Sequence, residues 1–287
     1  HIMEDHCIHC GQCLEVCPQN AKTFASRAKI IQIDIDPAEV NKNILIDTAI
    51  IGDVKAVLTI LNRRLSQQHH EAWMQEIQDM KAKYPLKYNQ EGLTGPYVIE
   101  ELYRVTKGDA IVVTDVGQHQ MWTAQKYRFL HPRTFLTSGG LGTMGYGMGA
   151  AIGAQTAFPN RRVALVTGDG SFHMNLNEAC TAVSYELPVI TVIFNNTVLG
   201  MVRQWQTAFY GKRYSSTDPH RKTNYVKLAE GFGAKGYHCE TLDAFSAAFA
   251  EALKSKGPVW IECVIDKDEK VLPMIPAGGS IEDMIMD

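Results

Sequence analysis

The sequence predicts an α/β protein whose main part is a doubly wound, mostly parallel β-sheet. From residue 94 onward, short apolar segments alternate with helical segments of about ten to fifteen residues, an order typical of parallel sheets covered by helices. Two of the apolar segments, 162–167 and 188–194, are separated by a stretch with the length and composition of one crossover helix, 177–186. Because such a crossover joins parallel strands, we expect these two strands to be neighbours.

Fewer elements are expected before residue 94. Residues 29–36 predict a strand that ends at Pro37, and residues 54–65 predict an amphipathic helix. The polar segment 66–90, partly helical at 71–83, has the composition of an interdomain linker. The predicted divisions of the chain are a cysteine segment at 1–20, a partial Rossmann-like middle domain at 21–65, the linker at 66–90 and the main domain at 91–287.

In the main domain, apolar runs that end at polar or glycine-rich stops predict strands, and apolar residues at helical spacing predict helices. Strands are expected at 110–115, 134–137, 162–167, 188–194, 234–239 and 259–265. Helices are expected at 97–106, from residue 120, and at 177–186, 225–231 and 242–254. A glycine-rich stretch, 138–153, follows the strand at 134–137.

Composition excludes some classes of function. The chain has 287 residues with 28 basic and 31 acidic side chains, and its net charge of −3 gives no electrostatic reason to expect a nucleic-acid partner. No apolar run reaches the roughly 18–20 residues that span a bilayer, and the first residues lack the organisation of a signal peptide. We therefore expect a cytoplasmic protein with no membrane association.

Two polar residues that end neighbouring strands predict a metal site. Asp169 follows the run 162–167 within Gly168-Asp169-Gly170, and Asn196 follows the run 188–194. In a parallel sheet both stops lie at the carboxyl ends of strands, where ligands bind. A carboxylate and an amide oxygen suit a hard cation such as Mg²⁺, whose remaining ligands are often substrate phosphates. An Asx-turn or a helix N-cap is the alternative role for Asp169 on its own.

Gly168-Asp169-Gly170 followed by Asn195-Asn196 is similar to the thiamine-diphosphate signature. Three longer stretches narrow this likeness: 116–122 (Val-Gly-Gln-His-Gln-Met-Trp), 138–147 and 200–206 (Gly-Met-Val-Arg-Gln-Trp-Gln). Through these motifs the chain resembles acetohydroxyacid synthase (acetolactate synthase), catalytic subunit. The resemblance extends from about residue 24 to the C-terminus and implies thiamine diphosphate and Mg²⁺ as cofactors.

The resemblance also implies a role for particular residues. It makes the Asp169 carboxylate, the Asn196 side-chain oxygen and the Val198 main-chain carbonyl the metal ligands. Met144 would press under the cofactor and hold it bent. Met201 and Trp205 would line the substrate pocket; the alternative is an ordinary amphipathic helix on which both side chains face the protein core. The residues expected to bind the cofactor are Gln118, His119, Gly142, Met144, Gly168, Gly170, Ser171 and Met201.

The implied reaction is the condensation of 2-oxoacids after decarboxylation, in branched-chain amino acid biosynthesis. The glutamate that activates the cofactor in this family belongs to an N-terminal pyrimidine-binding domain that the sequence does not contain. No catalytic residue is therefore assigned, and we expect the chain alone to turn over poorly. A homo-oligomer or a partner chain would supply that domain. Only the end of the FAD-carrying middle domain is present, so weak FAD binding is expected, and 272–279 resembles the family's tail, which folds over the site.

Four cysteines near the start do not belong to this resemblance. Cys7, Cys10, Cys13 and Cys17, followed by Pro18, have the spacing of the bacterial ferredoxin run. Because the fourth cysteine of that run ligates a second cluster, a complete [4Fe–4S] cluster here would need Cys17 to fold back, a distant cysteine or another chain. Zinc is the alternative metal. The other cysteines, at 180, 239 and 263, are expected to pack in the core.

Two other functions remain open. The cysteine spacing would suit an electron-transfer subunit of a 2-oxoacid:ferredoxin oxidoreductase, whereas the stretches 116–122 and 200–206 favour the transferase. A non-catalytic binding fragment is the third reading, because the activating glutamate is missing.

Overall fold

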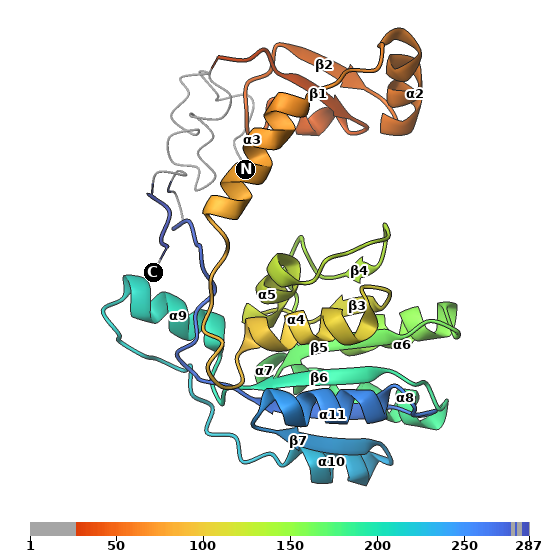
Figure 1. Cartoon of the computed structure of the whole chain (residues 1–287), viewed down its shortest axis with the longest axis vertical. Coiled ribbons are helices and arrows are strands. Elements are labelled where there is room, and N and C mark those ends of the chain that lie inside the picture. The colour runs from red at the N-terminus through yellow and green to blue at the C-terminus, as the bar shows by residue number, and fades with distance from the viewer. Residues whose placement is uncertain (1–26, 277–278, 280–282, 287) are drawn as a thin grey trace. The chain divides into compact units, whose positions relative to one another are not determined.

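The computed structural model describes residues 27–276, 279 and 283–286 of the chain (Figure 1). These residues form two compact units. The larger unit is Lys87–Val271, and the smaller one combines the described residues before Lys87 with those from Leu272 onward. The four N-terminal cysteines lie outside the described residues.

A six-stranded parallel sheet forms the centre of the larger unit. Its strand order is β4-β3-β5-β6-β8-β7, and every hydrogen-bonded pair of strands in it is parallel. The strands are β3 (Ile111–Thr114), β4 (Phe135–Leu136), β5 (Val163–Gly168), β6 (Ile190–Asn195), β7 (Lys235–Cys239) and β8 (Val259–Val264). The predicted parallel α/β sheet is thus confirmed, each of its strands falling within one residue or two of the expected run.

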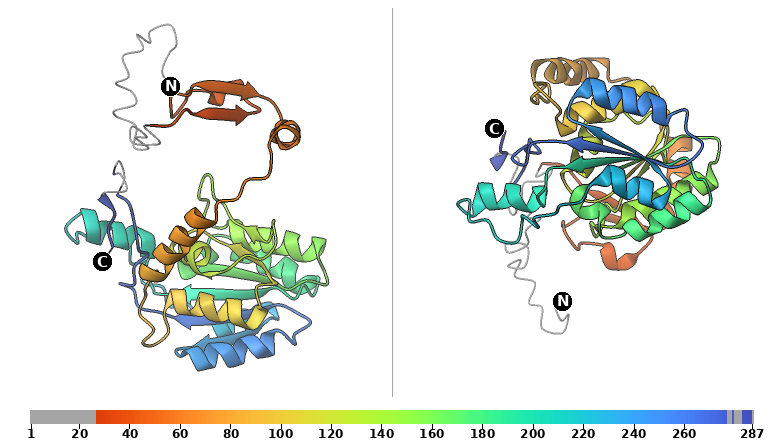
Figure 2. Two further views of the ribbon diagram at one scale, coloured as in Figure 1. Left: turned by 45° about the horizontal axis from the view of Figure 1, so that its top comes forward. Right: turned by 90° about the horizontal axis from the view of Figure 1, so that it is seen from below.

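Helices cover both faces of this sheet (Figure 2). One face is covered by α4 (Gly95–Thr106), α5 (Gln118–Lys126) and α11 (Leu242–Ala252). The other is covered by α6 (Tyr146–Ala157), α8 (Ala179–Ser184) and α10 (Tyr225–Phe232). The remaining helices of this unit are the short α7 (Asp169–Phe172), the 3-10 helix η3 (Leu176–Glu178) and α9 (Gly200–Phe209). The sheet is therefore doubly wound, as predicted.

Side chains that alternate along each strand pack into two hydrophobic cores, one on each face of the sheet. Val112, Val166 and Val192 pack against the α4, α5 and α11 side, whereas Val113 and Leu165 pack against the opposite side. All five side chains have no exposed surface. Because successive side chains in a strand point to opposite faces, the continuous apolar runs of the sequence fill both cores.

The crossover between β5 and β6 differs in detail from the predicted single helix at 177–186. The predicted range holds η3 followed by α8, so the α-helix covers only Ala179–Ser184, and the short α7 is separated from η3 at Asn175, where φ is −145° and ψ is 31°. At the start of α4 the helix begins two residues before the expected position, since Pro96 suits the first turn of a helix.

β5 and β6 are adjacent, as the sequence predicted. Their register pairs Ala164 with Ile190 and Gly168 with Phe194. The residues that follow the two strands, Asp169 and Asn196, therefore lie at the same edge of the sheet.

The smaller unit has a β–α arrangement of its own. β1 (Ile31–Asp34) and β2 (Thr48–Ile51) form a parallel pair, and they are accompanied by η2 (Pro37–Glu39), α2 (Val54–Arg64) and α3 (Glu71–Lys83). The Asp53 side chain caps α2 by accepting a hydrogen bond from the Ala56 amide at 2.9 Å. β2 was not predicted, because its four residues are too short a run to show alternation.

Among the residues that the structure describes, no helix combines the length and the apolar character needed to cross a lipid bilayer.

Candidate functional site

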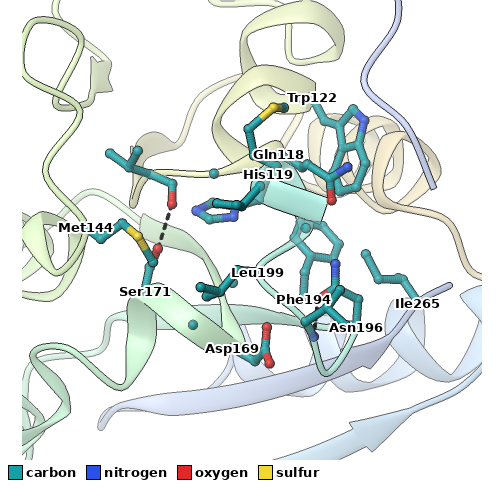
Figure 3. A pocket seen from close by; sticks show the side chains of 18 residues that line it. Gln118, His119, Trp122, Met144, Asp169, Ser171, Phe194, Asn196, Leu199 and Ile265 are labelled. Carbon is teal, nitrogen blue, oxygen red and sulfur yellow. Dashed lines mark hydrogen bonds between the residues drawn. The ribbon is translucent and has the colours of Figure 1, made fainter. Parts of the chain in front are cut away.

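A pocket lies at the carboxyl ends of β3, β5 and β6, the edge at which ligands bind in open α/β sheets (Figure 3). Its walls come from the segments that follow these strands, together with Met144 and Ile265. Most of the residues predicted from the sequence line it: Gln118, His119, Met144, Gly168, Asp169, Gly170, Ser171, Asn196, Val198 and Met201.

Asp169 is buried at the mouth of this pocket. It is the first residue of α7 and only 2% exposed. Burial raises the pKa of the Asp169 carboxyl to about 6, because the charged form loses its hydration, although the nearby Arg221 guanidinium acts in the opposite direction. A carboxylate in such a setting is stabilised by a cation close by.

Asn196 faces the same space from the end of β6 (Figure 3). Its side-chain oxygen accepts a hydrogen bond from the Val198 amide at 3.2 Å, which orients the amide group within the turn. Between them Thr197 has a φ of 62°, a left-handed conformation that is uncommon for a β-branched residue. The turn that carries two of the predicted ligands is therefore strained, as backbone at functional sites often is.

His119 contributes an unpaired nitrogen to the pocket. Its ring fits between two glycines, since a Cβ on Gly117 would lie 2.9 Å from the ring and one on Gly168 would lie 3.0 Å from Nδ1. Nε2 is buried and has no hydrogen-bond partner among the described residues. Burial lowers the pKa of His119 to about 3, so the ring is neutral at physiological pH. A buried nitrogen without a partner in a pocket indicates a place for a ligand.

A buried carboxylate holds the glycine-rich segment next to the pocket. The Gly145 amide donates to Asp115 Oδ1 at 2.7 Å, and Gly145 itself has a φ of 91°. A Cβ on Gly147 would lie 2.7 Å from the Leu165 side chain, so α6 approaches β5 closely. Met144, directly before this anchored turn, lies beside Gly170, whose Cβ would be 3.5 Å from the Met144 methyl carbon.

Gln118 links the pocket to the chain after β8. Its amide nitrogen donates to Gln204 Oε1 at 2.9 Å and to the Glu269 carbonyl at 2.7 Å. Gln204 in turn exchanges two hydrogen bonds with the Val271 backbone, at 2.9 and 3.0 Å. These two hydrogen bonds from the amide nitrogen fix the Gln118 side chain at the pocket wall.

The residues predicted for the substrate pocket lie on α9. Met201 lines the pocket, and with Trp205 it also lines a neighbouring apolar groove that includes Tyr210. Met201 packs partly against the core, but Trp205 is not buried and contacts Phe209 edge to face at 5.4 Å. The core-facing alternative therefore applies in part to Met201 and not to Trp205.

Some predicted residues lie elsewhere. Gly142 is not among the residues that line the pocket, and Cys7, Cys10, Cys13 and Cys17 lie outside the described residues. Of the later cysteines, Cys239 and Cys263 are buried as expected, but the expectation for Cys180 is wrong because it is exposed. Among the described residues, no group of three or more His, Cys, Asp or Glu side chains is placed to hold a metal.

Sequence reasoning missed three contributors to this region. Asp115 ends the apolar strand β3 just as Asp169 ends β5, so the same signal was present. Arg221 and Gln204 carried no such signal: they reach the site from a loop and a helix whose positions depend on tertiary packing.

Comparison with known proteins places the chain in a class. The model of the thiamine pyrophosphate enzyme C-terminal TPP binding domain matches residues 115–263, just over half of the 287 residues. The central-domain model of the same enzymes matches residues 4–61, a range that includes the cysteine segment. The chain belongs to the thiamine pyrophosphate enzymes.

Within this class the chain is similar to acetolactate synthases. It is 41% identical to an acetolactate synthase large subunit of Haemophilus influenzae over 276 residues, which are 93% of this chain and 48% of that protein. It is 40% identical to the isozyme 3 large subunit of Escherichia coli over 277 residues, 92% of this chain and 48% of that one. It is 41% identical to a chloroplastic acetolactate synthase of Oryza sativa over 281 residues, 93% of this chain and 44% of that one. The chain spans about half the length of the curated relatives it matches.

Proposed function

We propose that the pocket binds the diphosphate of thiamine diphosphate through Mg²⁺ as part of an acetolactate synthase-type active site. The observation that carries this proposal is the placement of Asp169 and Asn196 at adjacent strand ends, in a pocket that is also lined by His119, whose Nε2 has no partner among the described residues.

The residues present fit this cofactor. Buried Asp169 supplies a negative charge for the cation, and the turn around Gly168 and Gly170 lets backbone approach a phosphate closely. The neutral His119 ring already hydrogen-bonds the Asp115 backbone, and its Nε2 has no partner within the described chain, so a bound ligand or a water molecule held by it would give that nitrogen a partner.

In this proposal the Asp169 carboxylate, the Asn196 side-chain oxygen and the Val198 carbonyl would hold the metal, and the diphosphate would supply further oxygen ligands. Gln118 and His119 stand at the diphosphate end. Ser171 helps to shape the turn, because its hydroxyl donates to the Val116 carbonyl at 2.6 Å.

The other predicted cofactor contacts come from the glycine-rich segment and from α9. Met144 would contact the bound cofactor and help to orient it, while Gly142 belongs to the segment that Asp115 anchors through Gly145. Met201 and Trp205 line the route for the 2-oxoacid. Once bound, the cofactor supplies the carbanion chemistry that decarboxylation requires; the chain's own residues bind it, orient it and exclude water.

The substrate and the assembly are proposals about the whole protein. The names of the relatives support condensation of 2-oxoacids in branched-chain amino acid biosynthesis. A homo-oligomer or a partner chain would bring the pyrimidine-binding domain and its activating glutamate, and FAD would bind weakly to the partial middle domain. A thiamine-diphosphate subunit of a 2-oxoacid:ferredoxin oxidoreductase is the second candidate, favoured by the spacing of Cys7, Cys10, Cys13 and Cys17.

Two measurements test this proposal. Titration calorimetry should detect thiamine diphosphate binding that needs Mg²⁺ and is lost in Asp169→Ala; equal affinity of the variant and the parent would refute the site. Acetolactate formation from pyruvate should be small for the chain alone and should rise when a pyrimidine-binding domain is added. Reduction of ferredoxin in place of acetolactate formation would favour the second candidate.

A further inference from the structure

Arg221 supplies a positive charge to the carboxylate that we propose as a metal ligand. Its Nη1 donates to Asp169 Oδ2 at 2.9 Å, with side-chain exposures of 20% for Arg221 and 3% for Asp169. The guanidinium also lies beside Gly170, where a Cβ would be in ordinary van der Waals contact with Arg221 Nη2 at 3.7 Å. The pair is partly withdrawn from solvent, so the interaction is screened less than a surface ion pair.

The fold directs Arg221 to this position. His173, which follows α7, contacts the Asp169 carbonyl through Nδ1 at 2.6 Å and the Thr223 hydroxyl through Nε2 at 2.9 Å. Tyr225, 2% exposed, packs edge-on against His173 with ring centroids 5.7 Å apart. The chain from Arg221 to Tyr225 is therefore fastened to the turn that carries Asp169, and the ion pair is not a chance contact of a loose surface arginine.

The guanidinium and a divalent metal would compete for one carboxylate. Mg²⁺ needs an Asp169 oxygen at roughly 2.0–2.1 Å, and a dication next to a guanidinium is repelled by it. A diphosphate changes this balance, because its negative oxygens can serve both cations. Arginine is also well suited to phosphate, which it binds through paired hydrogen bonds.

We propose that Arg221 couples metal binding to diphosphate binding. As the counter-ion of Asp169 it opposes binding of the metal alone, and it transfers to the diphosphate oxygens when metal and cofactor enter together. This inference rests on the proposed function and adds to it a residue that makes the two ligands bind cooperatively.

Binding of Mn²⁺ to the full chain, followed by the electron paramagnetic resonance signal of the free ion, tests this coupling with and without thiamine diphosphate. For Arg221→Gln we expect the affinity for Mn²⁺ alone to rise about tenfold, because the competing charge is gone. We expect the affinity for thiamine diphosphate at saturating Mn²⁺ to fall several-fold, since one phosphate contact is lost. Arg221→Lys keeps the charge and should keep the affinity for Mn²⁺ alone close to that of the parent.

Two further variants complete the design. Lys222→Gln removes an exposed charge from the same segment without touching Asp169, and it should leave both affinities unchanged. Thr223→Val releases the tether to His173 and should shift the affinity for Mn²⁺ alone in the same direction as Arg221→Gln, by a smaller factor. This variant decides the matter if Arg221→Gln does not fold, as judged by circular dichroism.

The outcomes separate this inference from the proposed function. Suppose that the parent and the variants bind metal and cofactor, but that Arg221→Gln does not strengthen binding of Mn²⁺ alone. The coupling role of Arg221 is then wrong, whereas the proposed cofactor site stands. Thr223→Val gives the same answer if Arg221→Gln does not fold. If the parent binds neither ligand, both proposals are overturned.

Discussion

Gly200 and Gln118 fit together with no space for a side chain between them. A Cβ on Gly200 would lie 2.0 Å from Gln118 Oε1 and 2.7 Å from the Asn196 side-chain nitrogen. The first residue of α9 must therefore be glycine for Gln118 and Asn196 to keep the positions that line the pocket.

Gly200→Ala should weaken thiamine diphosphate binding at least tenfold, because the added methyl group displaces a predicted metal ligand and a predicted cofactor contact. Titration calorimetry with Mg²⁺ present measures the loss. Gly231→Ala in α10 is the control: nothing lies within 4 Å of its Cβ position, and replacing a helical glycine should leave binding unchanged while adding up to about 1 kcal/mol of stability. Unchanged affinity in Gly200→Ala would show that this close approach does not matter for the cofactor.

His119 should make the stability of the protein depend on pH. Burial lowers the pKa of His119 to about 3 in the folded state, whereas the unfolded chain takes up a proton below a pH of about 6.5. The unfolded state is therefore favoured as the pH falls from about 6.5 towards 3, and the free energy of unfolding should decrease by about 1.4 kcal/mol per pH unit from this residue.

Urea denaturation at pH 7 and pH 5 tests this, with His119→Asn as the comparison. The variant lacks the titrating ring, so its stability should fall by about 2 kcal/mol less than that of the parent between these pH values. Parallel losses in the two proteins would mean that His119 is hydrated in the folded state.

Asp115 should be a positioning residue for the glycine-rich segment. It is 2% exposed and accepts the Gly145 amide, so Asp115→Asn replaces one acceptor oxygen by a donor that has to face backbone N–H groups. We expect a loss of about 1–3 kcal/mol in unfolding free energy and weaker cofactor binding. Asp109→Asn, at an exposed pair with Arg161, should cost less than about 1 kcal/mol and leave binding intact. Equal effects of the two substitutions would contradict this role.

His238 should titrate at a raised pH. The hydrogen bond from Nδ1 to Glu262 Oε2, 2.7 Å long, raises the pKa of His238, and exposed Glu240 adds a weaker contact at 3.3 Å. Because the folded protein binds this proton more tightly than the unfolded chain does, His238 stabilises the protein fully at pH values below its unfolded pKa of about 6.5. This stabilisation is lost as the pH rises through the pKa of the folded state.

Proton NMR titration of the imidazole measures this directly. Glu262→Gln should lower the pKa of His238 more than Glu240→Gln does. The same substitution should also loosen Asn195, whose side chain donates to Glu262 Oε1 at 2.7 Å next to the proposed ligand Asn196. If Glu240→Gln has the larger effect, the buried hydrogen bond is not what sets the pKa.

Much of the fold was predictable because local patterns and tertiary packing agree. The apolar runs that became β5 and β6 are buried on both faces, and the crossover between them had the right length for parallel neighbours. Asp169 and Asn196 could be placed together because strand ends in a parallel sheet share one edge. Where packing decides, the sequence said less: the helix predicted at 177–186 begins as the 3-10 helix η3 and is an α-helix only over α8, and Cys180 is exposed although it lies in an apolar segment of the sequence.

The site residues that the sequence analysis did not predict on any signal have one feature in common: they contact the site from distant positions in the chain. Arg221 reaches Asp169 across 52 positions, and Gln204 reaches Gln118 across 86. No short-range pattern encodes such contacts, because they depend on where a loop and a helix pack in the finished fold. The raised pKa of Asp169 and the lack of a partner for His119 Nε2 within the described part of the chain likewise depend on burial, which a motif does not specify.

A crystal of the chain grown with Mn²⁺ and thiamine diphosphate tests the central claim most directly. The anomalous signal of manganese should give one strong peak in contact with Asp169, the Asn196 side-chain oxygen and the Val198 carbonyl, with the diphosphate beside it. Bound cofactor with the metal at another position, or a pocket that stays empty of both at saturating concentrations, would contradict the account.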